Sequence, residues 1–161
     1  MKRLCLLLAA VLLSACAARA PLPAQLPQLA LPMQLHVQRE QAGQHQDWLL
    51  VIQQEPHALR WTLLDLLGIP LARQLLDDGR WQAEGLLPPN PAARELFAAL
   101  LFALTDEQAL PAAYPGAEQQ ANQRKLGQRW TVIYQQPDQF TLKLDHGLRY
   151  LVSPLPIEST P

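Results

Sequence analysis

Charged side chains, long hydrophobic runs and reactive groups are all scarce in this sequence of 161 residues. Charged residues make up 17% of the chain, below the usual quarter, and the formal net charge is -1, so no basic surface for nucleic acid is expected. The apolar run near the N-terminus, Leu4–Leu13, is about half as long as a membrane-spanning helix, which needs about 20 residues. Apolar residues still reach 49%, which excludes wholesale disorder and is enough for one folded domain.

Candidate catalytic groups are few. The only serines after residue 16 are Ser153 and Ser159, near the C-terminal end, and there is no Gly-x-Ser-x-Gly motif. The four histidines are scattered and match no metal-ligand spacing: His36, His45, His57 and His146. No glycine-rich phosphate loop or dinucleotide fingerprint is present. We therefore predict a protein that is not an enzyme and has no metal site and no cofactor apart from a covalent lipid.

The N-terminal segment is typical of a secretory signal peptide. Lys2 and Arg3 precede the apolar run, and the run ends in Leu13-Ser14-Ala15-Cys16. This tetrapeptide resembles the lipobox of bacterial lipoproteins. The resemblance implies cleavage after Ala15, a diacylglycerol on the Cys16 sulfur and an acylated (palmitate-type) new amino terminus. An ordinary signal peptide with an incidental cysteine is the alternative.

Three expectations follow from a lipid on Cys16. Residues 1–15 are removed and take Cys5 with them, so the mature chain has no disulfide. Residues 16–33 form a proline-rich, extended tether between the lipid and the domain. Ala17 stands where an aspartate resembles an inner-membrane retention signal, which favours the outer membrane, on its periplasmic side.

From Gln34 onward the pattern changes to that of β-strands. Leu35 and Val37 alternate with polar neighbours, whereas Trp48–Ile52 is a continuous apolar run typical of a strand covered on both faces. Further strands are expected at Leu59–Leu63, Leu71–Leu75 and Arg80–Gly85. Asp77-Asp78-Gly79 is a strong hairpin signal.

One helix is expected over residues 91–104. Asn90 can cap it and Pro91 suits its first turn. Leucine and phenylalanine recur at helical spacing and the opposite face is also apolar, so the helix is predicted to be buried against the concave face of a sheet. Both a plain core helix and a wall or plug of a lipid cavity fit this pattern.

The C-terminal third is predicted to return to strands. Residues 105–122, with two prolines and a glycine, indicate a long loop with one short turn of helix. Strands are then expected at Trp130–Tyr134, Phe140–Leu144 and Leu148–Val152, the last two joined by a turn at Asp145-His146-Gly147. Residues 154–161 are expected to be a flexible tail.

We therefore predict a mostly antiparallel β domain with one main helix (α+β class) over residues 34–153. Eight to eleven strands would form a curved sheet or half-barrel around the helix and leave a concave apolar space. Such a space suits an acyl chain, because burying eight methylenes offers about 6 kcal/mol. The predicted cavity wall consists of Leu49, Val51, Trp61, Leu63, Trp81, Phe97, Leu100, Leu101 and Leu104. The same side chains could instead simply fill the core.

As a whole, the chain resembles a family of uncharacterised bacterial outer-membrane lipoproteins. The features that carry the resemblance are the lipobox, Leu63–Pro70, Asp78–Trp81, Leu86–Pro88 and the apolar helix. The order of elements is also similar to that of the LolB family of outer-membrane lipoprotein receptors, which implies a half-barrel with a lipid-accepting cavity. Relatives resemble products encoded beside fatty-acid and polyene synthesis enzymes, which implies a role in moving a lipid-like product. No segment matches the receptor's membrane-inserting loop residue by residue.

These patterns predict a lipid-anchored protein of the outer membrane, facing the periplasm, that binds or transfers a hydrophobic ligand without catalysis. The ligand would be an acyl or polyene-type lipid, or the acyl chains of a lipoprotein. Its other partners would be the membrane and the lipoprotein processing and sorting machinery, and not nucleic acid. A structural or assembly lipoprotein that binds a protein partner in the cell envelope is the alternative. A hydrolase or transferase that uses carboxylates such as Asp65, Glu84 and Asp106 is a third possibility.

Overall fold

The structure is a computed structural model that describes residues 19–155. The predicted signal peptide (1–15), Cys16 and nearly all of the predicted tail (154–161) lie outside the described residues. Among the helices of the described part, none has the length and apolar character needed to cross a membrane.

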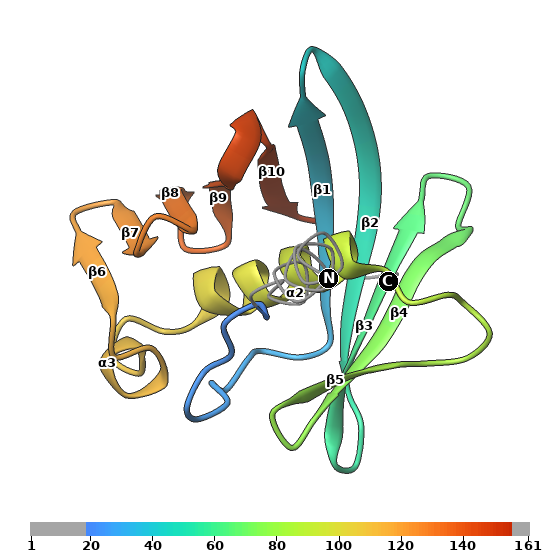
Figure 1. Ribbon diagram of the computed structural model, residues 1–161, viewed down its shortest axis with the longest axis horizontal. Coiled ribbons are helices and arrows are strands. Elements are labelled where there is room, and N and C mark those ends of the chain that lie inside the picture. Colours follow the sequence, from blue (N-terminus) through green and yellow to red (C-terminus); the bar gives the residue numbers. More distant parts are fainter. Residues whose placement is uncertain (1–18, 156–161) are drawn as a thin grey trace, which may run out of the picture.

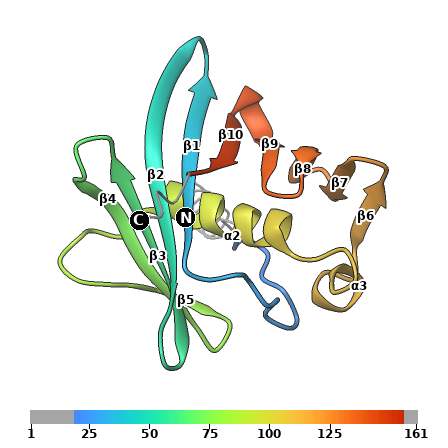
Figure 2. The same cartoon turned by 180° about the vertical axis from the view of Figure 1, so that it is seen from behind.

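A single antiparallel sheet of ten strands makes up most of the domain (Figures 1 and 2). The strands are β1 (Met33–Gln41), β2 (Gln44–Gln54), β3 (Ala58–Asp65), β4 (Pro70–Asp77), β5 (Arg80–Ala83), β6 (Ala117–Gln120), β7 (Gln123–Leu126), β8 (Trp130–Gln136), β9 (Gln139–Lys143) and β10 (Arg149–Pro154). Their order in space is β5-β4-β3-β2-β1-β10-β9-β8-β7-β6, so two five-strand meanders meet where β1 pairs with β10. The sheet is open, because β5 and β6 each pair on one side only.

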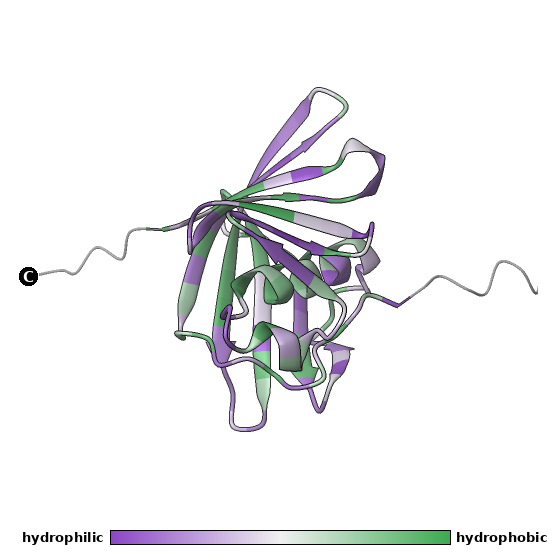
Figure 3. Cartoon of the chain, turned by 90° about the vertical axis from the view of Figure 1, so that its left-hand side faces the viewer, coloured by the Kyte–Doolittle hydropathy of each residue, from purple (hydrophilic) through white to green (hydrophobic). Residues whose placement is uncertain are grey.

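One long helix, α2 (Pro91–Leu104), crosses the inside of this sheet (Figure 3). Asn90 caps it as predicted, since its side-chain oxygen accepts a hydrogen bond of 3.0 Å from the backbone N–H of Ala93. The helix leads from edge strand β5, through the short helix α3 (Leu110–Ala113), to edge strand β6. Residues 96–103 are all buried, because the curved sheet surrounds a helix that is apolar on nearly every side. The predicted class, a mostly antiparallel β domain with one main helix, is confirmed.

Alternation along the strands decides which side chains meet α2. In β2, Leu50 and Ile52 are fully buried, whereas Leu49 and Val51 are half-buried and point to the other face of the sheet. The register continues this row, since Leu50 pairs with Leu63 of β3. Buried side chains such as Leu50, Ile52 and Leu63 therefore line the concave face of the sheet. Together with α2 they form the interior of the domain.

The Asp78-Gly79 hairpin is confirmed. Strand β4 ends at Asp77, β5 begins at Arg80, and the two residues between them have φ angles of 44° and 67°. Two consecutive positive φ angles define a type I′ turn, in which glycine is favoured at the second position because it has no side chain to clash. The turn places Trp81 opposite Leu76 on the concave face.

The prediction of a long loop over residues 105–122 is wrong in part. It contains α3, as predicted, but also the edge strand β6, and the next strand, β7, was not predicted. These two strands consist mainly of polar residues and have no apolar alternation of their own. They are held by pairing, since β7 lies between β6 and β8.

Arg124 of β7 closes the C-terminal end of α2. Its side chain is 4% exposed, and one guanidinium nitrogen donates to the backbone oxygens of Phe102 and Thr105 at 2.9 and 2.7 Å. The guanidinium carbon also lies 5.7 Å from the centre of the Phe102 ring and 5.3 Å from that of Tyr134. The Tyr134 hydroxyl donates to the carbonyl of Ala103, and burial raises the pKa of Tyr134 to about 12 against a smaller opposing effect of Arg124. A buried cation thus satisfies the free carbonyls that every helix end carries.

Several residues of the described part of the proline-rich segment pack against the domain. Leu22, Leu29 and Leu31 pack against the core, and the backbone N–H of Ala24 donates to the oxygen of Ala113 at 2.8 Å. Most of the segment expected to be a spacer (16–33) is therefore extended, as proline predicts, but covers the domain surface instead of standing free.

Candidate functional site

An open apolar cleft of about 410 Å³ lies beside the first turns of α2. We call it the apolar cleft. It is lined by Arg39, Gln46, Trp48, Leu63, Asp65, Leu71, Asn90, Ala92, Ala93, Leu96, Leu148 and Tyr150. The rings of Trp48 and Tyr150 form one wall, with centroids 6.2 Å apart. Its volume is within the range of small-molecule sites in proteins.

Small side chains on α2 leave room for this cleft. Ala92 and Ala93 lie where the helix begins, and the larger Leu96 follows at its deep end. The strands supply the opposite wall, because Trp48 lies on the concave face of β2, next to the row that contains Leu50. The result is a space with apolar walls between a helix that starts with alanines and a sheet that carries large rings.

The polar side chains of the lining are those of Arg39, Gln46, Asp65, Asn90 and Tyr150. Arg39 donates a hydrogen bond of 3.4 Å to Gln46 across the β1–β2 hairpin. Burial raises the pKa of the Tyr150 hydroxyl, and the nearby charge of Arg39 and a hydrogen bond from it oppose that rise. Tyr150 is therefore a neutral hydroxyl at physiological pH, and the lining suits a long apolar chain with a small polar head.

The β3–β4 turn beside the cleft exposes apolar side chains. The exposed fractions are 62% for Leu66, 86% for Leu67 and 54% for Ile69. The turn is well ordered, because one side-chain oxygen of Asp65 accepts hydrogen bonds of 2.9 and 2.8 Å from the backbone N–H groups of Leu67 and Ile69. The turn therefore presents three large apolar side chains to solvent at the edge of the cleft.

The structure places the nine predicted wall residues in five different surroundings. Trp61, Phe97, Leu100 and Leu101 are completely buried in the core. Leu63 lines the apolar cleft, Trp81 lines a second cleft across α2, and Leu104 is half-buried near the end of the helix. Leu49 and Val51 lie on the other face of the sheet, because the strand alternates. The predicted common wall is thus not formed, and a ligand-binding role stays a prediction for Leu63 and Trp81.

Aromatic rings occupy much of the space that the sequence suggested might be hollow. The ring of Trp61 lies 5.5 Å from that of Phe97 and 5.7 Å from that of Trp81, and Phe97 and Trp81 are 5.9 Å apart. Three mutually contacting rings fill the space between α2 and the β3–β5 part of the sheet. What remains open lies along the sides of the helix.

The sequence interpretation missed Trp48, Leu71, Leu148 and Tyr150, which line the apolar cleft. The turn at Gly68-Ile69-Pro70 was predicted from the sequence and is confirmed between β3 and β4, but the exposure of Leu66 and Leu67 on it was not predicted. In the described part of the chain, no group of three or more histidine, cysteine, aspartate or glutamate side chains could hold a metal ion.

The half-buried carboxylate of Glu95 connects α2 to the second half of the sheet. Both oxygens of Glu95 accept hydrogen bonds of 2.7 Å from Arg129, and one accepts a further bond of 2.8 Å from the indole N–H of Trp130. Burial raises the pKa of the Glu95 carboxyl, but the bonds from Arg129 and Trp130 outweigh burial, so the pKa lies below its usual value.

Glu95→Gln is expected to lower the free energy of unfolding by about 1–2 kcal/mol at pH 7. Because the folded-state pKa lies below the unfolded one, the ionised carboxylate stabilises the protein above the unfolded pKa, and this contribution is lost as the pH falls through the folded pKa. Urea unfolding at pH 7, 5 and 3 should therefore show the two proteins converging in acid. A difference that stays constant across this range, or an equal loss in the exposed control Glu118→Gln, would contradict the assignment.

Comparison with known proteins gives one family. A family model described as "Protein of unknown function (DUF3261)" matches residues 31–147, which covers all the elements from β1 to the turn before β10. No curated protein matches the chain.

Proposed function

We propose a function for this chain from its own residues, because it belongs to DUF3261, a family of proteins of unknown function. The protein is a non-catalytic, lipid-anchored protein that binds or transfers a hydrophobic ligand. The ligand is an acyl or polyene-type lipid, or an acyl chain of a lipoprotein, and it lies in the apolar cleft. The lipid on Cys16 holds the domain at the outer membrane on its periplasmic side.

The observation that carries this proposal is the apolar cleft together with the exposed turn at its rim. Asp65 and Leu71, on either side of the β3–β4 turn, line the cleft, so the turn with its exposed apolar side chains adjoins the cleft. An acyl chain needs apolar area and a fitting shape, and each methylene that leaves water contributes about 0.8 kcal/mol. The exposed leucines support uptake of the chain from another apolar surface, a membrane or a lipoprotein.

Ala92→Trp is expected to weaken binding of a polyene fatty acid, cis-parinaric acid, by more than tenfold, because the indole fills the mouth of the cleft. Ala92 is exposed and lies on the cleft wall, so the larger ring does not disturb the core. The fluorescence of the probe, which rises in an apolar site, measures binding to the full chain. Ala112→Trp places the same ring on an exposed position of α3, outside the cleft, and should bind like the wild type. Equal affinities in all three proteins would refute the assignment.

Leu67→Gln is expected to slow transfer of the same probe from neutral vesicles to the protein by about tenfold. The side chain is 86% exposed, so its only apolar contact would be with the donor surface, and its burial there contributes about 2 kcal/mol. Leu86→Gln removes a fully exposed leucine from the β5–α2 connection and should transfer normally. Stopped-flow fluorescence gives the rates, and identical rates for both variants would mean that the β3–β4 turn has no special role.

A further inference from the structure

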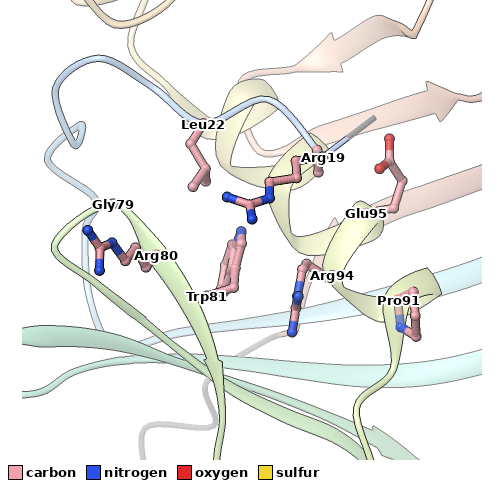
Figure 4. A pocket seen from close by; sticks show the side chains of 9 residues that line it. Arg19, Leu22, Gly79, Arg80, Trp81, Pro91, Arg94 and Glu95 are labelled. Carbon is pink, nitrogen blue, oxygen red and sulfur yellow. The ribbon is translucent and has the colours of Figure 1, made fainter. Parts of the chain in front are cut away.

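A second cleft, of about 500 Å³, lies beside α2 and carries an excess of positive charge (Figure 4). It is formed where the N-terminal segment, the β4–β5 turn and the start of α2 meet. Arg19, Arg80 and Arg94 come one from each of these segments, and we call the site the arginine cleft. Leu22 and the indole of Trp81 give it an apolar wall.

The arginine cleft is separate from the apolar cleft. Helix residues 91, 94 and 95 line the arginine cleft, whereas residues 92, 93 and 96 line the apolar one. At 3.6 residues per turn these two sets point to opposite sides of the helix. The two clefts therefore lie on either side of the first turns of α2.

Nothing in the cleft neutralises its arginines. Its one carboxylate, Glu95, already accepts two hydrogen bonds from Arg129 and one from Trp130. Arg94 uses one nitrogen, at 3.2 Å, on the amide oxygen of Gln74, which is a neutral group. Within residues 19–155, no ion pair includes an arginine of this cleft.

The cleft also contains a hydrogen-bond donor that has no acceptor, which is a second indication of an anion site. The indole nitrogen of Trp81 is buried and has no partner among the described residues. Figure 4 shows this nitrogen directed towards the side of the cleft where the guanidinium of Arg19 lies. Because the Arg19 side chain is exposed, a shift of its guanidinium would admit an oxyanion that accepts from both donors.

We propose that the arginine cleft binds the phosphate of an anionic phospholipid headgroup in the membrane that carries the anchor. Arg19 is three residues from Cys16, a stretch of chain that can span at most about 10 Å, so a lipid on Cys16 would bring headgroups within reach of the cleft. The Arg19 guanidinium and the indole N–H bind the phosphate, whereas Arg80 and Arg94 add positive charge around the cleft. Leu22 and the indole face contact the start of the acyl chains. That the phosphate comes from a membrane lipid depends on the proposed lipid anchor on Cys16. That the cleft binds an anion does not depend on it.

The test follows the indole N–H signals of the full chain by NMR in a neutral maltoside detergent, with nitrogen-15 in the tryptophans. Dihexanoylphosphatidylglycerol should shift the Trp81 signal saturably, because its N–H gains an acceptor. Inorganic phosphate and zwitterionic dihexanoylphosphatidylcholine should bind at least about tenfold more weakly, since the first lacks the apolar part and the second lacks the net charge. Trp48, on the wall of the apolar cleft, reports separately on binding there, so a failure of this proposal is distinguishable from a failure of the proposed function.

The variant Arg19→Gln/Arg80→Gln should weaken the phosphatidylglycerol response of Trp81 about tenfold. It should leave the fold intact, because among the described residues neither arginine side chain has a hydrogen bond or an ion pair. Lys143→Gln/Arg149→Gln removes the same charge from exposed positions of β9 and β10 and should respond like the wild type. The proposal is overturned by an absent Trp81 shift, by an unchanged response in the first variant, or by equal affinity for phosphatidylcholine. Equal affinity for inorganic phosphate would overturn the lipid as ligand and leave a site for a free anion.

Discussion

Replacing Phe97 with alanine is expected to lower the free energy of unfolding by about 4 kcal/mol, the largest single effect that we predict. Phe97 is completely buried, and its ring lies 5.5 Å from that of Trp61 and 5.9 Å from that of Trp81. Removing it takes away apolar contacts and leaves a cavity that the rigid helix and sheet cannot close. Urea unfolding followed by circular dichroism measures the loss.

Phe97→Leu is the matched control, because it keeps most of the volume and should cost only about 1 kcal/mol. The comparison also distinguishes two views of the interior. If the centre of the concave space were an open lipid cavity, alanine at this position would cost little, because no packed contacts would be lost. A loss below about 1 kcal/mol for Phe97→Ala would therefore contradict the packed interior described here.

Arg124→Met is expected to lower the free energy of unfolding by about 3 kcal/mol. The guanidinium donates to the carbonyls at the end of α2 and to the side chain of Gln119, and it lies between the rings of Phe102 and Tyr134. Methionine fills similar volume but donates nothing, so the carbonyl of Thr105 loses its hydrogen bond from Arg124 in a buried place. The same urea titration gives the value.

Two controls test the reason for this loss. Arg124→Lys keeps the charge but not the planar set of donors, and it should recover about half of the stability. Arg149→Met removes an arginine whose side chain is 54% exposed and paired with Glu40, and it should cost less than about 1 kcal/mol. Equal losses at positions 124 and 149 would show that Arg124 does not hold the helix end.

The sequence predicted the parts of this fold whose signals are local. Asn90 and Pro91 indicated the start of α2, and Asp78-Gly79 indicated the hairpin between β4 and β5. Most of the apolar strands were also predicted. The pairing of β1 with β10 was beyond such reasoning, because it joins residues that are more than a hundred positions apart. The overall class could still be inferred, since the elements that carry local signals are also the ones that define it.

The misplaced residues have definite physical causes. Trp48–Ile52 is apolar without interruption, so its sequence does not say which side chains face the helix, and Leu49 and Val51 were assigned to the wrong side of the strand. Strands β6 and β7 are polar because their buried residue is Arg124, whose partners are backbone carbonyls far away in the chain. The clefts were missed because they arise where α2 begins with small residues, which only the packed structure reveals.

The central claim is that the apolar cleft holds an acyl chain, and residue-level photolabelling of the full chain tests it most directly. A palmitate analogue with a diazirine at the end of its chain is bound, irradiated and located by mass spectrometry. We predict labels on Trp48, Leu148 and Tyr150 that excess palmitate abolishes. Labels that palmitate does not displace, or that fall on Leu49 and Val51 of the outer face instead, would contradict the claim.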